Sequence, residues 1–223
     1  MSRIIAGAAK GTAIRMPRGS ATRPTTDRVR EAVFNTLVDW AGSAAVDSAR
    51  QFEGISFLDL YAGSGAMGLE AASRGASPVT CVERDANATK SIRDNVAALR
   101  LEVRVVANQV AQYLGGPAAP FDIIFLDPPY DTGNDEIERC LAAITRCGWF
   151  ADDGVIVVER SSRSEPFEWP SEVERQWQKS YGETVIYYGD RGADPMLGET
   201  PEEPGQDQPR NGRDQKEATD VGN

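Results

Sequence analysis

The sequence predicts an α/β fold, a doubly wound and mostly parallel seven-stranded sheet with helices on both faces. From residue 55 onward, short apolar segments alternate with segments of helical periodicity, which is the pattern of repeated strand–helix units. A glycine-rich segment directly follows the first apolar segment, as in the ligand-binding turn of such folds. The chain of 223 residues is long enough for one domain of this kind with extensions.

Five apolar segments of strand length are expected to form the parallel part of the sheet. They are residues 55–60, 79–82, 103–107, 121–126 and 155–159. Two further segments, 177–181 and 184–188, flank Gly182 and predict a closing antiparallel pair. Four segments between the strands have the length and composition of helices. They are residues 66–74, 86–99, 110–114 and 135–147.

An N-terminal extension precedes the sheet. Residues 4–7 and 12–16 flank a glycine-rich turn and predict a small hairpin. A proline, two threonines and Asp27 then form a helix-start signal, and apolar side chains repeat at helical spacing through Asp39. We therefore divide the chain into a hairpin-plus-helix extension (1–40), a domain (41–189) and a C-terminal segment (190–223).

Charge is distributed unevenly along the chain, whose net charge is −10. Residues 1–30 carry seven Lys/Arg against one acid, a charge of +6, and residues 190–223 carry nine acids against four bases, a charge of −5. The remainder therefore holds −11. A basic end on an acidic body is typical of a local phosphate-binding surface. The C-terminal segment has almost no large apolar residues and is expected to be disordered.

The composition excludes several classes of chemistry. The chain has no histidine, which removes Ser-His-Asp and Cys-His catalysis, and we expect no metal. Cys81, Cys140 and Cys147 are too few for a disulfide framework and predict reduced thiols, with Cys140 and Cys147 buried. No apolar stretch of membrane-spanning length and no secretory signal are present, so we expect a cytoplasmic protein without membrane partners.

The segment from Gly63 to Gly68 has the pattern Gly-x-Gly-x-x-Gly between a predicted strand and a predicted helix. Glycines let a ligand approach backbone amides, and a carboxylate at Glu83, at the tip of the next strand, can accept two ribose hydroxyls. Asp59 lies four residues before Gly63. A carboxylate there repels a pyrophosphate but suits a ligand with an ammonium and a sulfonium, which favours S-adenosylmethionine over a dinucleotide.

The segment Asp127-Pro128-Pro129-Tyr130 follows the fourth predicted strand, on the ligand side of the sheet. An exocyclic base amine is a poor nucleophile because its lone pair is delocalised into the ring. Acceptors at Asp127 and the Pro128 carbonyl can hold its two hydrogens and free that lone pair. Tyr130 can stack on the base and hold it in line with a methyl donor. The segment therefore predicts methyl transfer to a base amine.

Four segments carry a resemblance to a known family. They are Arg3 to Ile5 with Gly7, Arg23 to Glu31 (RPTTDRVRE) with Phe34-Asn35, Leu58 to Gly65 (LDLYAGSG), and Asp127 to Tyr130. Over about residues 1–189 the sequence resembles the bacterial small-subunit (16S) ribosomal RNA guanine-N2 methyltransferases. The RPTTDRVRE helix start is the family-specific part, whereas Asp-Pro-Pro-Tyr is shared by many amino-methyltransferases.

The resemblance implies a class I methyltransferase sheet and a cytoplasmic enzyme that acts on RNA packaged with ribosomal proteins. It also implies that Asn108 and Gln109 lie at the adenine of the cofactor. We expect a monomer, with Asp127, Pro128, Pro129 and Tyr130 as the catalytic residues. The expected cofactor-binding residues are Asp59, Tyr61, Ala62, Gly63, Ser64, Gly65, Glu83, Arg84, Asn108 and Gln109.

Residues 1–30 are expected to hold the RNA, and we expect the core fold to survive without them. The candidate RNA contacts are Arg3, Lys10, Arg15, Arg18, Arg23, Arg28 and Arg30. Three alternatives stay open: an adenine-N6 methyltransferase acting on DNA or RNA, an NAD-dependent oxidoreductase, and a non-catalytic RNA-binding module. The short interval between Gly65 and Asp127 leaves no room for a large target-recognition domain and speaks against a DNA enzyme. Asp59 and the intact Asp-Pro-Pro-Tyr segment speak against the other two.

Overall fold

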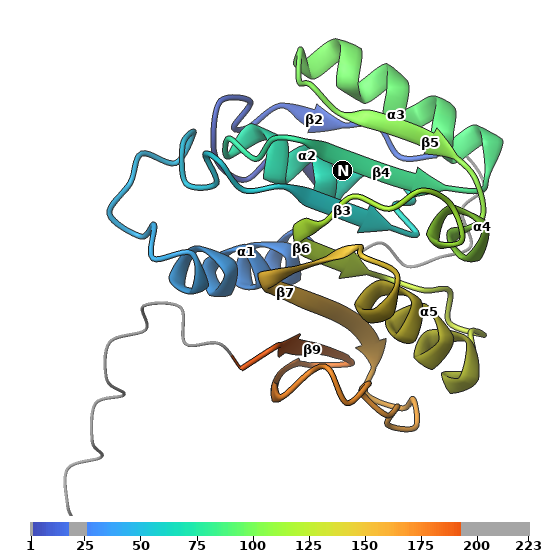
Figure 1. Cartoon of the computed structure of the whole chain (residues 1–223). Helices are drawn as coiled ribbons and strands as arrows, with labels where there is room; N and C mark the ends of the chain where they lie inside the picture. The colour runs from blue at the N-terminus through green and yellow to red at the C-terminus, as the bar shows by residue number, and fades with distance from the viewer. Residues whose placement is uncertain (1, 18–25, 193–223) are drawn as a thin grey trace, which may run out of the picture.

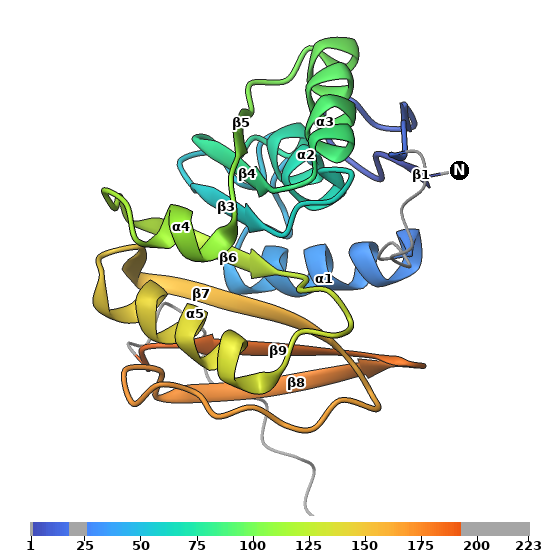
Figure 2. The same ribbon diagram turned by 90° about the vertical axis from the view of Figure 1, so that its right-hand side faces the viewer.

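The predicted sheet is present, and its strand order fixes where a ligand can bind. The computed structural model describes residues 2–17 and 26–192. Seven strands form one sheet in the order β5-β4-β3-β6-β7-β9-β8 (Figures 1 and 2). Strands β3 to β7 pair in parallel, whereas β9 pairs antiparallel with β7 and β8. The strands are β3 (Phe57–Leu60), β4 (Val79–Glu83), β5 (Arg104–Ala107), β6 (Phe121–Leu126), β7 (Phe150–Ser161), β8 (Arg175–Tyr181) and β9 (Thr184–Asp190).

Helices cover both faces of this sheet (Figure 2). They are α1 (Asp27–Trp40), α2 (Ala66–Ser73), α3 (Ala86–Leu99), α4 (Val110–Leu114) and α5 (Asn134–Arg146). Helices α4 and α5 pack on one face, where Leu141 of α5 lies in the same apolar cluster as Leu58 of β3. Helices α1, α2 and α3 cover the other face, where Phe34 of α1 stacks on Phe57 with 6.1 Å between ring centroids. Burying each such ring contributes roughly 1.5–3 kcal/mol to folding.

The order of the strands places a ligand-binding edge at the centre of the sheet. From β3 the chain moves outward through β4 to β5, and then returns to the other side of β3 with β6 and β7. Ligands of open α/β sheets bind at the carboxyl ends of the strands where the order reverses in this way. Tyr61, Glu83, Asn108 and Asp127 stand at the carboxyl ends of β3, β4, β5 and β6, so all four meet at this edge.

The N-terminal extension is packed into the domain. The short strands β1 (Ser2–Arg3) and β2 (Ala13–Ile14) pair antiparallel. Strand β2 lies within the predicted 12–16, whereas β1 precedes the predicted 4–7. Ile4 and Ile14 are buried, and they share an apolar cluster with Leu69 of α2. The extension therefore completes the core on this side of the sheet.

Glu70 of α2 fastens the extension to the domain. Its fully buried carboxylate accepts hydrogen bonds from the amides of Ile5 and Ala6, at 2.7 and 2.9 Å, and from Nε of Arg74 at 2.9 Å. Hydrogen bonds to a charged group contribute about 1.5–3 kcal/mol each, and a buried carboxylate that loses its partners is costly. These contacts argue against the expectation that the core fold survives without residues 1–30.

Arg30 takes part in this junction, and the prediction that it contacts RNA is wrong. Its side chain is fully buried. The guanidinium donates to the carbonyl of Arg3 at 2.6 Å, to Asp27 at 3.0 Å and to the hydroxyl of Ser2 at 3.2 Å. Arg30 therefore holds the helix start of α1 against β1 and has no surface to offer a phosphate.

Several other bounds differ from those predicted. Strand β7 begins at Phe150, five residues before its predicted start, and β9 continues to Asp190, which pairs with Arg175. Helix α5 ends at Arg146, so Cys147 lies beyond it and is exposed, whereas Cys140 is buried as expected. The predicted disorder of the C-terminal segment falls almost entirely on residues outside the described part of the chain. Among residues 2–17 and 26–192, no helix combines the length and apolar character that crossing a bilayer requires.

Candidate active site

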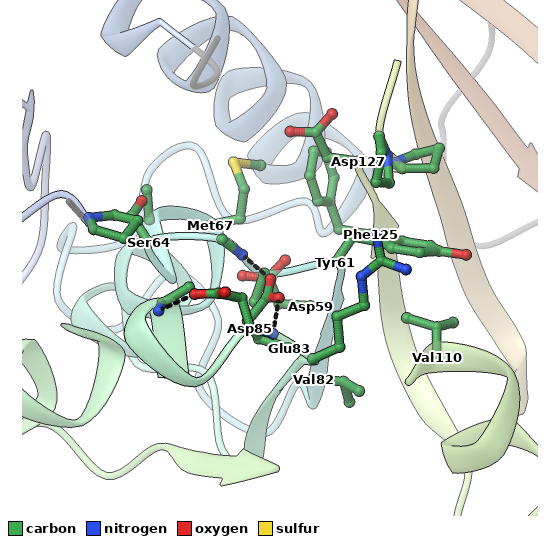
Figure 3. Close-up of a pocket in the computed structure, with 18 of the residues that line it drawn as sticks. Asp59, Tyr61, Ser64, Met67, Val82, Glu83, Asp85, Val110, Phe125 and Asp127 are labelled. Atoms are coloured by element: carbon green, nitrogen blue, oxygen red, sulfur yellow. Dashed lines mark hydrogen bonds between the residues drawn. The ribbon is translucent and has the colours of Figure 1, made fainter. Parts of the chain in front are cut away.

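A cavity of about 850 Å³ opens at the carboxyl edge of the sheet (Figure 3). It is lined by most of the residues that the sequence predicts for the site. These are Asp59, Tyr61, Ala62, Gly63, Ser64, Glu83, Arg84, Asn108, Gln109, Asp127, Pro128, Pro129 and Tyr130. In Figure 3, Asp59 and Glu83 lie close together, and Asp127 stands apart from them beside Phe125. The two predicted halves of the site, cofactor and amine, therefore share one cavity.

The three glycines of the turn after β3 have different physical roles. Gly63 has φ 55°, and a Cβ added to it would meet only a backbone oxygen, at 3.9 Å, so this turn leaves its cavity side clear for a ligand. Gly65 has φ 76° and packs on Ile92 of α3, where a Cβ would lie 3.0 Å from a side-chain carbon. Gly68 lies against Cys81, whose sulfur a Cβ would approach to 2.4 Å. Gly65 therefore lets the turn pack closely on α3, and Gly68 lets α2 pack closely on β4. Gly65 is not part of the cavity wall.

Glu83 holds the turn from the tip of the neighbouring strand. Its carboxylate accepts a hydrogen bond from the amide of Gly63 at 2.8 Å with one oxygen, and from the amide of Asp85 at 2.7 Å with the other. A carboxylate offers about four acceptor positions, so positions are left over for ligand hydroxyls. Glu83 therefore shapes the turn and retains the capacity for ribose recognition that the sequence predicts.

Asp59 is more deeply placed than its sequence position suggested. Its side chain is buried at the floor of the cavity, where one oxygen accepts from the amide of Gly68 at 2.9 Å. Burial raises the pKa of Asp59 to about 7, the Gly68 amide opposes this rise, and the nearby Glu83 charge adds to it. A cationic group of a ligand beside Asp59 would restore the ionised form.

Tyr61 has a backbone conformation that favours glycine. Its φ is 61°, which costs a residue with a side chain roughly 1–3 kcal/mol and is found mostly at functional sites. Its hydroxyl lies 3.4 Å from a carboxylate oxygen of Glu136 and 3.5 Å from the sulfur of Cys140, both on α5. The left-handed turn at Tyr61 lets the chain leave β3 sharply and form the glycine-rich loop below the cavity.

Other residues line the cavity without having been predicted from the sequence. They are Ser2, Met16, Pro17, Ala66, Met67, Val82, Asp85, Asn87, Ala88, Val110, Ala111, Phe125, Asp131 and Glu136. Met16 and Pro17 come from the N-terminal extension, so the extension forms part of the cavity wall. Val82, Val110 and Phe125 supply apolar surface for a planar ring, and their positions beside strand ends were the available signal in the sequence.

The Asp-Pro-Pro-Tyr segment forms the side of the cavity after β6. Asp127 is half-buried, and its amide hydrogen-bonds the carbonyl of Leu60 at 3.4 Å, which ties the segment to the end of β3. Pro128 is buried. Tyr130 is 72% exposed, and its hydroxyl donates to Oγ of Ser161 at 2.6 Å. A large aromatic ring fixed at the mouth of a cavity is suited to stacking on an incoming base.

The basic residues of the N-terminal extension are only partly described. Arg3, Lys10, Arg15 and Arg28 are exposed, as contact with RNA requires. Arg18 and Arg23 lie outside the described residues. Arg15 directly precedes the part of the extension that lines the cavity, because Met16 and Pro17 follow it. An exposed basic surface therefore adjoins the cavity.

The strand order, the glycine-rich turn after β3 and the acidic residue at the tip of β4 define a class I methyltransferase fold. The chain belongs to the family described as "Conserved hypothetical protein 95", whose model matches residues 2–190.

Similar proteins extend over most of the chain. The Escherichia coli (strain K12) protein named ribosomal RNA small subunit methyltransferase D is 37% identical over 158 residues, which cover 70% of this chain and 73% of that protein. The Bacillus subtilis (strain 168) protein named putative rRNA methyltransferase YlbH is 34% identical over 196 residues, covering 85% of this chain and 100% of that protein. A solved structure of the putative methyltransferase yhhF from Escherichia coli superposes with a TM-score of 0.71 at 34% identity, covering 85% of this chain and 97% of that chain.

Proposed function

We propose that this protein transfers a methyl group from S-adenosylmethionine to the exocyclic N2 amine of a guanine in small-subunit (16S) ribosomal RNA. The observation that carries the proposal is the single cavity in which the glycine-rich turn with Glu83 faces the Asp-Pro-Pro-Tyr segment. The similarity to a protein named ribosomal RNA small subunit methyltransferase D supports the choice of RNA. This substrate would place the reaction in the cytoplasm.

The residues that line the cavity support the proposed cofactor. Gly63 leaves its side of the turn clear, and Glu83 has acceptor positions left for two ribose hydroxyls. Val82, Val110 and Phe125 offer apolar surface to an adenine, and Asp59 lies where an ammonium or sulfonium would favour its ionised form. When bound, S-adenosylmethionine supplies an activated methyl group on a sulfonium.

The chain's own residues would prepare the amine. Asp127 and the carbonyl of Pro128 accept from the two amine hydrogens, so the lone pair is released from the ring toward the methyl donor. Tyr130, anchored through Ser161, presents its ring to the base. Positioning and hydrogen bonding suffice for the transfer itself, because the amine becomes cationic only when it is methylated and can then release one proton to Asp127 or to water. A base must leave its stack to reach the cavity, which favours a guanine in a loop.

The experiment uses purified small-subunit particles from cells that lack this gene. Particles are incubated with the protein and isotope-labelled S-adenosylmethionine, and the rRNA is digested and mapped by mass spectrometry. We expect label in N2-methylguanosine at one position, and far less label with the Asp127→Asn variant after the same incubation time. Label in N6-methyladenosine would show that adenine rather than guanine is the target. Absence of label in rRNA would overturn the proposal that rRNA is the substrate.

A further inference from the structure

A second hollow adjoins the mouth of the cavity, on the far side of Tyr130. It has a volume of about 440 Å³ and is lined by Tyr130, Gly133, Asn134, Arg160, Arg163, Ser164 and Glu165. We call it the Arg160 groove. Tyr130 lines both hollows. A base stacked on its ring therefore lies beside the Arg160 groove, which the phosphate of the same nucleotide or of the next one can reach. The groove is therefore placed where the backbone of an RNA would pass.

Arg160 is built into this groove as a buried cation. It is 8% exposed and lies near the carboxyl end of β7, at the same edge of the sheet as Asp127. One Nη donates to the carbonyl of Thr132 at 3.1 Å, while Nε has no hydrogen-bond partner among the described residues. A buried guanidinium with an unused donor is costly unless something accepts from it. Burial lowers the pKa of Arg160, and Tyr187 and Asp127 partly restore it.

A second arginine stands at the rim of the groove. The side chain of Arg163 is 76% exposed and pairs with Glu183 through one Nη, at 2.7 Å. A guanidinium has five N–H donors, so this pairing leaves others for an anion. Glu165 is the single acid among the seven lining residues, against two arginines, so the lining carries a net positive charge.

The groove is also fixed relative to the stacking ring. Oγ of Ser161 accepts from the hydroxyl of Tyr130 at 2.6 Å and from the amide of Arg163 at 3.2 Å. Gly133, the N-cap of α5, lines the groove as well, but Asp135 and Glu136 in the first turn counter the attraction of that helix end. The arginines rather than the helix end therefore supply the attraction for an anion.

We infer that the Arg160 groove is a binding site for a phosphate of the RNA backbone next to the target nucleotide. Arginine suits this role because its planar donors match two phosphate oxygens. Arg160 and Arg163 lie on the domain itself, apart from the basic N-terminal extension. The inference rests on the proposed function, because it assumes that a base enters the cavity beside Tyr130.

The experiment measures binding of unmodified small-subunit rRNA transcript to the full chain at several salt concentrations. The variants are Arg163→Ala and Arg160→Lys, and the matched control is Arg50→Ala. Arg50 is 68% exposed and pairs with Glu53, as Arg163 pairs with Glu183, but it lies before β3, at the other end of the parallel strands. We expect Arg163→Ala to weaken binding severalfold and to reduce the slope of log affinity on log salt by about 0.7, the value of one phosphate contact.

Arg160→Lys keeps the charge but loses the planar pair of donors that matches two phosphate oxygens, so we expect weaker RNA binding with unchanged affinity for S-adenosylhomocysteine. If Arg163→Ala matches Arg50→Ala in both affinity and salt slope, the phosphate site is overturned, even if Arg160→Lys is impaired. Methyl transfer by the wild-type protein to small-subunit particles is measured in parallel. Failure of that transfer would refute the proposed function, whereas normal transfer with an ineffective Arg163→Ala would refute the groove alone.

Discussion

The side-chain amide of Asn95 makes two hydrogen bonds with the backbone of Arg15. Its oxygen accepts from the Arg15 amide at 2.9 Å and its nitrogen donates to the Arg15 carbonyl at 3.0 Å. The same nitrogen lies 3.4 Å from the carbonyl of Ser64 in the glycine-rich turn. One buried side chain on α3 thus joins the basic extension to the loop that lines the cavity.

Replacing Asn95 should loosen this junction. Asn95→Ala leaves the amide and carbonyl of Arg15 without these partners, and we expect a loss of about 1–3 kcal/mol in the free energy of unfolding. Because Met16 and Pro17 follow Arg15 along the cavity wall, affinity for S-adenosylhomocysteine should also fall. Urea unfolding and calorimetry measure the two effects. Ser91→Ala on the same helix is the control, since its hydroxyl donates to the carbonyl of Asn87 within α3. Equal stability of the two variants would contradict this role.

Glu83 should be needed for cofactor affinity. The Glu83 carboxylate accepts hydrogen bonds from two backbone amides, and Glu83→Gln places an amide donor against one of them. The substitution also weakens the acceptor for ribose hydroxyls. We expect affinity for S-adenosylhomocysteine to fall about tenfold or more, the equivalent of roughly 1.5–3 kcal/mol. Calorimetry gives the value, with the exposed Glu102→Gln as control. An unchanged dissociation constant in Glu83→Gln would remove Glu83 from the cofactor site.

Asp59 should make the protein less stable as the pH rises. The pKa of its carboxyl is raised from 3.8 to about 7 in the folded protein, so between these values the folded state binds more protons than the unfolded state. The protonated Asp59 contributes fully to the free energy of unfolding below about pH 4. This contribution is lost as the pH rises through 7, and above that the free energy of unfolding no longer changes through Asp59. Asp59→Asn should remove this slope and gain roughly a few kcal/mol relative to wild type by about pH 8. Urea unfolding of both proteins measures it, and parallel pH curves would refute the raised pKa.

Tyr130 should act through its ring rather than its hydroxyl. Tyr130→Phe keeps the stacking surface and loses only the hydrogen bond to Ser161, so RNA affinity and the rate at saturating RNA should change little. Tyr130→Ala removes the surface, and we expect a loss of about 1–3 kcal/mol in binding of the target base. Steady-state kinetics with small-subunit particles separate the two variants. A defect of equal size in both would assign the role to the hydroxyl.

The sequence predicted those elements whose signals are local. The bounds of α3, α4 and β6 agree with the expected 86–99, 110–114 and 121–126. Asp85 caps α3 by accepting from the amide of Ala88, a signal contained in neighbouring residues. The cavity was also predictable, because parallel strands bring their carboxyl ends to one edge of the sheet whatever the conformation of the loops.

What the sequence left open depends on contacts between distant segments. Arg30 has the same local pattern as the exposed Arg28, and only the position of β1 makes it a buried partner of Ser2 and Arg3. Asn95 shows no signal on its own helix, since its partners are 80 and 31 residues away. The place of Met16 and Pro17 at the cavity likewise follows from the docking of the extension through Glu70.

Asp127 should be required for chemistry and dispensable for cofactor binding. Asp127→Asn keeps the shape of the side chain but lowers its strength as an acceptor, so the amine keeps its lone pair delocalised. We expect the single-turnover rate of methyl transfer to fall by about 10²–10⁴-fold, with little change in affinity for S-adenosylhomocysteine. Rapid-quench measurements with small-subunit particles give the rate, and calorimetry gives the affinity. Asp152→Asn, an exposed carboxylate on β7, is the control for loss of one charge. A near-normal single-turnover rate in Asp127→Asn would show that the amine is activated by other acceptors, and a lost cofactor affinity would move Asp127 from the amine to the cofactor.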